Sequence, residues 1–92
     1  MAVRLLQVTL TAVATQISSS NTFCKQILIQ NNAAHSFRVG DSTVSATKGI
    51  LLAAGTPGGS LNSGPVDAYQ SYLSDWWVFG TTNDKVDVLY IT

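Results

Sequence analysis

The side chains that most often carry out catalysis are few and scattered in this chain. It has one histidine, His35, one cysteine, Cys24, and five acidic residues, all of them aspartate. Nucleophilic catalysis needs a base held against the nucleophile, and neither His35 nor Cys24 lies in a recognisable nucleophile motif. We therefore predict a turn histidine and a buried strand cysteine, and a protein that is not an enzyme.

Metal and cofactor sites are not predicted either. Metal ligands occur in clusters, and the aspartates are spread along the chain. Residues 55–64 contain Gly58-Gly59-Ser60 but lack the Lys-Ser/Thr ending of a phosphate-binding loop, so an exposed flexible loop is expected there. Asp41, Asp75 and Asp84 neighbour small polar residues, where their carboxylates are expected to accept backbone N–H bonds in turns. We expect no cofactor.

Charge is sparse. Charged residues make up 11% of the chain, and the formal net charge is +0, whereas typical domains contain about 25% charged residues. The absence of a Lys/Arg cluster argues against electrostatic binding of nucleic acid or of an acidic membrane. No apolar stretch approaches the ~20 residues of a membrane span. A polar but uncharged surface of this kind suits packing against neighbouring proteins.

The aromatic-rich stretch 73–92 predicts a β-hairpin, because two β-rich runs flank a short polar turn. Adjacent residues of a strand point to opposite faces, so Trp76 and Trp77 cannot form one stacking platform. We expect one of the two in the core and the other at an interface, where tryptophan is enriched.

The last run of the chain is apolar on both faces beyond Asp87. Val86, Val88 and Tyr90 share one face, and Leu89 and Ile91 share the other. A strand that is apolar on both sides is normally covered on both sides. In so small a chain, one cover is expected to be another subunit.

Residues 1–14 alternate between apolar Leu6, Val8 and Leu10 and polar neighbours, which is a strand pattern. A weak signal peptide can also be written here, but polar residues interrupt its apolar segment. The strand either closes the domain's own sheet or forms an arm that grips a neighbouring chain. The sequence leaves both possibilities open.

The remaining chain has no helical periodicity, and turn signals recur about every 8–12 residues. Strands are expected at 23–30, 36–39, 43–46 and 50–52, with a long Gly/Pro loop at 54–65, a strand or irregular segment at 67–72 and a single turn at 73–75. The prediction is one all-β domain, residues 1–92, built as a small antiparallel β-sandwich or barrel. Residues 1–14 form its N-terminal strand or arm, and residues 23–92 its β-body.

Four separated stretches also follow a shared pattern. They are Lys25-Gln-Ile-Leu-Ile-Gln-Asn, Phe37-Arg-Val-Gly-Asp-Ser-Thr-Val-Ser-Ala-Thr-Lys-Gly-Ile-Leu-Leu, Leu73-Ser-Asp-Trp-Trp-Val-Phe-Gly-Thr and Val86-Asp-Val-Leu-Tyr-Ile. This pattern resembles small virion structural proteins of tailed bacteriophages. The resemblance covers residues 24–92 and leaves 1–20 outside.

The resemblance implies a non-enzymatic capsid decoration (cement) protein on the head exterior, which clusters at local three-fold positions and bridges subunits of the major capsid protein. A homo-oligomer, expected to be a trimer, is the predicted self-associated form. The predicted interface residues are Leu6, Val8, Leu10, Trp76, Trp77, Leu89 and Ile91. A tail or baseplate component is the first alternative. A carbohydrate-binding β-module that attaches phage to host, and a small secreted hydrolase inhibitor, are weaker ones.

Overall fold

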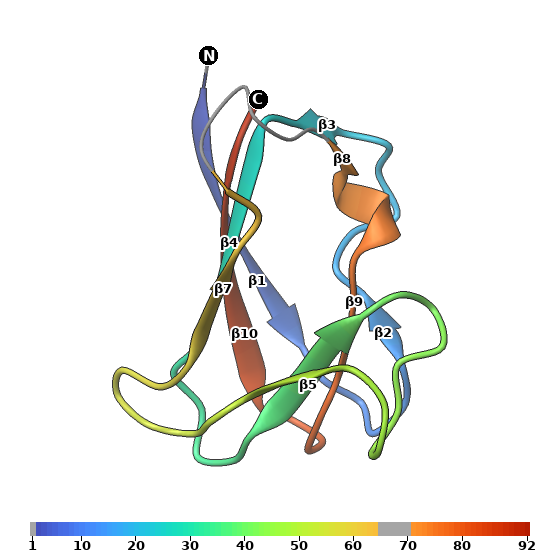
Figure 1. The fold of residues 1–92 in the computed structure, drawn as a ribbon, viewed down its shortest axis with the longest axis vertical. Coiled ribbons are helices and arrows are strands. Elements are labelled where there is room, and N and C mark those ends of the chain that lie inside the picture. Colours follow the sequence, from blue (N-terminus) through green and yellow to red (C-terminus); the bar gives the residue numbers. More distant parts are fainter. Residues whose placement is uncertain (1, 65–70) are drawn as a thin grey trace.

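The computed structural model describes residues 2–64 and 71–92, and their regular structure is almost entirely β (Figure 1). The strands are β1 (Val3–Thr9), β2 (Thr15–Gln16), β3 (Phe23–Cys24), β4 (Gln26–Asn31), β5 (Phe37–Gly40), β6 (Ile50–Leu52), β7 (Ser60–Asn62), β8 (Ser71–Tyr72), β9 (Trp77–Phe79) and β10 (Lys85–Ile91). The helical structure of the described residues is one 3-10 turn, Leu73–Asp75. The all-β prediction is confirmed.

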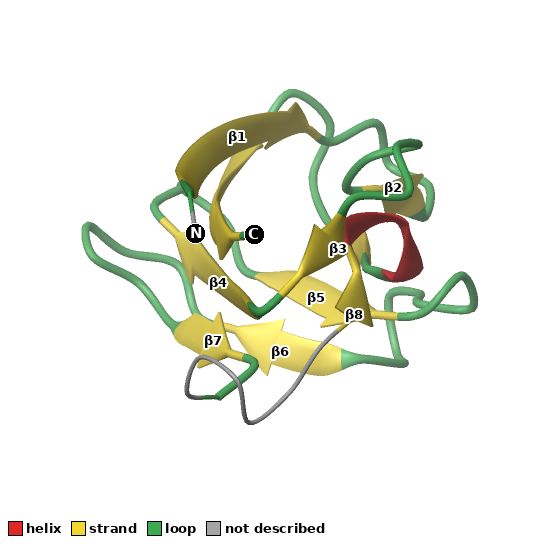
Figure 2. Ribbon diagram, turned by 90° about the horizontal axis from the view of Figure 1, so that it is seen from above, coloured by secondary structure: helices red, strands yellow, loops and turns green. Residues whose placement is uncertain are grey.

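Two four-stranded antiparallel sheets pack around a common core (Figure 2). The first sheet has the strand order β1-β10-β4-β7, and the second has the order β2-β9-β5-β6. β3 and β8 form a short separate ribbon at the end of the molecule where both termini lie (Figure 1).

The predicted hairpin of residues 73–92 is wrong. β9 pairs with β2 and β5, whereas β10 lies between β1 and β4 in the other sheet. Residues 80–84 therefore carry the chain across the core from one sheet to the other. Gly80 lies so close to the core that an added Cβ would stand 2.7 Å from the Leu10 side chain. A strand forms hydrogen bonds along both of its edges only when it lies inside a sheet. As inner strands of two different sheets, β9 and β10 both do so, which an isolated hairpin would not allow.

The N-terminal segment belongs to the domain's own sheet. β1 pairs with β10 over its whole length, from Val3 opposite Ile91 to Thr9 opposite Lys85. The pairing continues past the strand, because the Leu10 N–H donates to the Asp84 carbonyl at 2.9 Å. Of the two possibilities left open by the sequence, the structure selects the closing strand rather than the free arm.

Several predicted boundaries also change. The strand expected at 23–30 is broken at Lys25, so that β3 and β4 belong to different sheets. Residues 43–46 form no strand, and the loop expected at 54–65 contains β7. Gly58 and Gly59 are tied down by backbone bonds to Asn31 and Ala53, so this part of the loop is not free. The strands expected at 36–39 and 50–52 and the turn at 73–75 are confirmed, while 65–70 lie outside the described residues.

The core lies between the inner faces of the two sheets. It consists of Val8, Leu10, Ile17, Cys24, Ile27, Ile29, Phe37, Val39, Leu52, Leu73, Val78, Val86 and Val88. One buried polar side chain, Asn31, stands out among the described residues. Its amide nitrogen donates to the carbonyls of His35 and Leu52, each at 3.0 Å, and its oxygen accepts from the Ala33 N–H at 2.8 Å. Asn31 thus connects the end of β4 to β6 in the second sheet.

Candidate interaction surface

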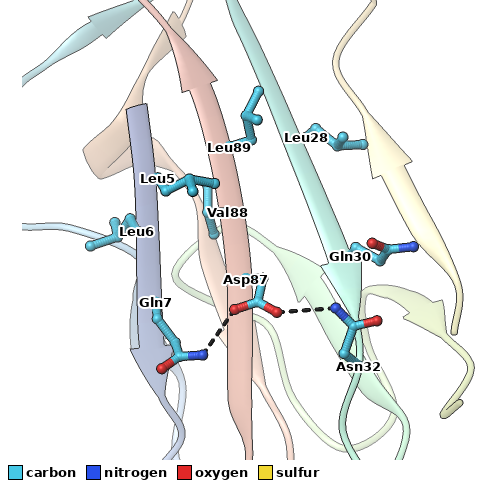
Figure 3. A pocket seen from close by; sticks show the side chains of 9 residues that line it. All are labelled: Leu5, Leu6, Gln7, Leu28, Gln30, Asn32, Asp87, Val88 and Leu89. Carbon is cyan, nitrogen blue, oxygen red and sulfur yellow. Dashed lines mark hydrogen bonds between the residues drawn. The ribbon is translucent and has the colours of Figure 1, made fainter. Parts of the chain in front are cut away.

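The outer face of the first sheet carries a row of leucines. The register sets Leu5 of β1 opposite Leu89 of β10, and Leu89 opposite Leu28 of β4. Directly opposed residues of antiparallel strands share a face, with Cα atoms about 4.5–5.5 Å apart. We call Leu5, Leu89 and Leu28 the leucine row; Figure 3 shows them across three neighbouring strands. Leu5 is 78% exposed, and the other two are half-buried.

A polar row borders the leucine row. The Asp87 carboxylate accepts one hydrogen bond from the Gln7 amide at 2.9 Å and another from the Asn32 amide at 3.0 Å (Figure 3). These bonds join β1, β10 and the turn after β4. They also orient the Asp87 carboxylate along the sheet. The negative charge at the border of the leucine row is therefore already hydrogen-bonded.

A hollow of about 620 Å³ lies over this part of the sheet. Its lining includes the leucine row, the polar row and Gln30. The lining has one acidic side chain and no histidine, cysteine or basic residue, so it offers no base paired with a nucleophile. Leucine and amide side chains of this kind suit the binding of an apolar surface.

The predicted interface residues fall into two groups. Val8 and Leu10 lie in the domain's own core and do not reach a partner, and Leu6 packs against that core. The predicted interface role is therefore wrong for Val8 and Leu10, because the domain's own core encloses them. Leu89 and Ile91 lie on the outer face of the first sheet, only partly buried, as the two-sided pattern of that strand predicted.

The two tryptophans point to opposite faces, as the strand alternation predicted. Trp76 packs against the core, and its indole N–H donates to the Ser71 hydroxyl at 3.0 Å. Trp77 lies on the outer face of the second sheet, where it pairs with Gln16 and Gly40, and it is half-buried. The structure thus packs Trp76 against the core and leaves Trp77 half-buried on the surface, and an interface role for Trp77 stays a prediction.

Sequence reasoning missed Leu5 and Leu28. Leu5 lies just before the alternating run Leu6, Val8 and Leu10, and Leu28 lies between the glutamines of β4. A signal was present, since Leu5-Leu6 and Ile27-Leu28-Ile29 are consecutive apolar residues that must place one side chain outward. The pairing that brings Leu5, Leu28 and Leu89 together is not visible in the sequence.

The residues considered for catalysis do not assemble. Cys24 is buried, and burial raises the pKa of its thiol, which disfavours the reactive thiolate. His35 lies in the turn after β4, where its Nδ1 is 2.9 Å from the Asp84 carboxylate. Asp41 accepts from the Thr43 N–H at 2.8 Å, and hydrogen bonds from Thr43 lower the pKa of Asp41. The predicted turn histidine, buried cysteine and turn aspartate at position 41 are confirmed.

Within residues 2–64 and 71–92, no three His, Cys or acidic side chains lie close enough together to hold a metal ion. In the same residues, no helix is long and apolar enough to cross a membrane. Comparisons of the chain with protein-family models, curated proteins and solved structures found no match.

Proposed function

We propose that this chain is a non-enzymatic structural protein that binds a neighbouring protein in a larger assembly through the leucine row. The observation that carries this proposal is the leucine row, one exposed and two half-buried leucines side by side on the outer face of the first sheet. Contiguous exposed apolar side chains on a small domain mark interaction sites. Fully burying one leucine contributes about 1.5–3 kcal/mol, so a partner that covers the leucine row gains part of its binding free energy there.

The assembly that we propose is the virion of a tailed bacteriophage, with the chain acting as a capsid decoration protein on the head exterior. Two features support this choice. The sequence resembles small phage virion proteins, and only 11% of its residues are charged. The proposed partners are the major capsid protein and further copies of the chain itself, for which the sequence-based expectation is a trimer.

Binding to capsids tests the proposal. Purified protein is mixed with expanded, undecorated capsids of the phage that encodes it, and bound protein is measured after sedimentation. Leu5→Gln should weaken binding at least about tenfold, because the burial of one leucine is lost. Leu51→Gln is the matched control, since Leu51 is 54% exposed but lies on β6 of the second sheet. Failure of the unmodified protein to bind, or equal losses in both variants, would contradict the proposal.

Copy number separates the head from the tail. A decoration protein is present in hundreds of copies per particle, whereas a tail or baseplate component is present in few. Quantitative gel densitometry of purified particles measures this number directly, and a low copy number would favour the tail reading.

A carbohydrate-binding module is the second candidate, favoured by the exposed aromatic pair of β3 and β8. The rings of Phe23 and Tyr72 are 5.0 Å apart at an interplanar angle of 67°. Both side chains are exposed. Their edge-to-face arrangement offers no flat two-ring platform, but one ring face could stack on a sugar. A glycan array with Tyr72→Ala as the negative variant tests this candidate.

A further inference from the structure

β1 has one unpaired edge. Ala2 and Thr92 exchange both backbone hydrogen bonds, and Leu10 donates to Asp84. In an antiparallel pair, hydrogen-bonded and non-hydrogen-bonded positions alternate. The even-numbered residues of β1 therefore bond to β10, and the N–H and C=O groups of Val3, Leu5, Gln7 and Thr9 point away from it. In the strand order of the described residues, no strand lies on that side.

β1 lacks most of the features that normally protect an edge strand. Natural edges are kept short, or carry proline, a bulge or charged side chains, most often lysine. β1 is seven residues long, contains no proline, keeps an uninterrupted register with β10, and has a single charged residue, Arg4. Its exposed side chains include Val3 and Leu5, which are apolar. Such an edge is a template for another extended strand.

We propose that β1 pairs antiparallel with β1 of a second copy of this chain across a two-fold axis at Leu6. In this register Val3 lies opposite Thr9, and Leu5 lies opposite Gln7. Each of these pairs consists of residues whose free backbone groups face the seam, so the whole edge is satisfied. The two first sheets become one eight-stranded sheet, and the two leucine rows meet on the same outer face.

The charges of two copies permit this pairing. Arg4 is the one charged residue of β1, and in the proposed register it lies opposite Val8 of the second copy. The two guanidinium groups are then four residues apart along the seam, about 13 Å. The formal net charge of +0 adds no long-range repulsion between copies. A partner strand must place its inward and outward side chains in the same alternation as β1. A second copy of β1 does so by symmetry.

This inference names the self-partner of the assembly proposed above, but it does not depend on a phage origin. A two-fold pair differs from the trimer expected from the sequence, because pairing of β1 with itself has two-fold symmetry, which a three-fold ring lacks. Mass measurement distinguishes the two: light scattering should give about twice the 9.8 kDa of one chain.

Disulfide trapping tests the seam. Leu6 and its symmetry mate form a non-hydrogen-bonded pair with Cα atoms about 4.5 Å apart, within disulfide range. In a Cys24→Ala background, Leu6→Cys treated with oxidised glutathione should give a covalent dimer as the main product. Arg4→Cys is the control and should remain mostly monomeric. Equal cross-linking of both, or of neither, would overturn the proposed pairing.

Two further variants separate the edge from the leucine row. Val3→Pro combined with Thr9→Pro removes two seam N–H groups that make no bond to β10, and it should convert the dimer to a monomer. Leu89→Gln changes the leucine row without touching the edge, and should remain dimeric. If the proline variant stays dimeric, or the unmodified protein is monomeric or trimeric, the edge proposal fails. Loss of capsid binding in Leu89→Gln would still support the proposed function.

Discussion

Asn31 is the one polar side chain that the described structure encloses completely, and its three hydrogen bonds hold a turn and a strand in place. A buried amide is tolerated only when its hydrogen bonds are made. The backbone of Asn31 is used as well, since its carbonyl accepts from the Gly58 N–H at 2.8 Å. This residue therefore organises the Gly/Pro-rich segment that looked like a free loop in the sequence.

Asn31→Ala should lower the free energy of unfolding by about 3 kcal/mol, because three bonds are lost and the carbonyls of His35 and Leu52 lose a donor. Urea denaturation followed by circular dichroism measures the change. Asn32→Ala is the control: it removes one exposed bond to Asp87 and should cost less than about 1 kcal/mol. Equal effects would show that the hydrogen bonds of the Asn31 amide contribute no more to stability than the exposed bond of Asn32.

The two faces of β10 play different roles. Val88 is fully buried between the sheets, whereas its neighbour Leu89 lies on the outer face and is partly exposed. Val88→Ala should cost about 2–3 kcal/mol, from the lost methyl groups and the cavity they leave. Leu89→Ala should cost about 1 kcal/mol in a dilute sample, since less of its surface is buried. Chemical denaturation of both variants measures the difference, and a larger loss for Leu89→Ala would mean that the outer face is covered within a single chain.

β1 is an integral strand, so its removal should unfold the domain. Deletion of residues 1–12 removes Val8 and Leu10 from the core and leaves one edge of β10 without its hydrogen bonds. The truncated chain is expected to lose its near-UV circular dichroism and its cooperative thermal transition. A truncated protein that still unfolds cooperatively would restore the free-arm interpretation.

The two sheets form one cooperative unit, because a single core cluster draws its side chains from both. Residues 80–84 cross directly between the sheets, and Trp76 packs on the shared core. Without the other sheet, the apolar inner face of either sheet would be exposed to water.

Unfolding in urea should therefore show one transition, with the same midpoint by tryptophan fluorescence and by far-UV circular dichroism. The native far-UV spectrum should lack a substantial helical component, because the helical structure of the described residues is one three-residue turn. Separate midpoints for the two probes would show that the sheets unfold independently.

Local patterns in the sequence were enough to predict the fold class and the direction of individual side chains. The alternation around Trp76 and Trp77 and the two-sided run ending in Leu89 and Ile91 are properties of neighbouring residues. Local patterns could not predict which strands pair, because pairing joins residues far apart in the chain. The leucine row brings together positions 5, 28 and 89. The sequence of β9 and β10 resembles a hairpin, but the two are inner strands of different sheets. Packing of the shared core selects those partners and their register, and only the tertiary structure contains that information.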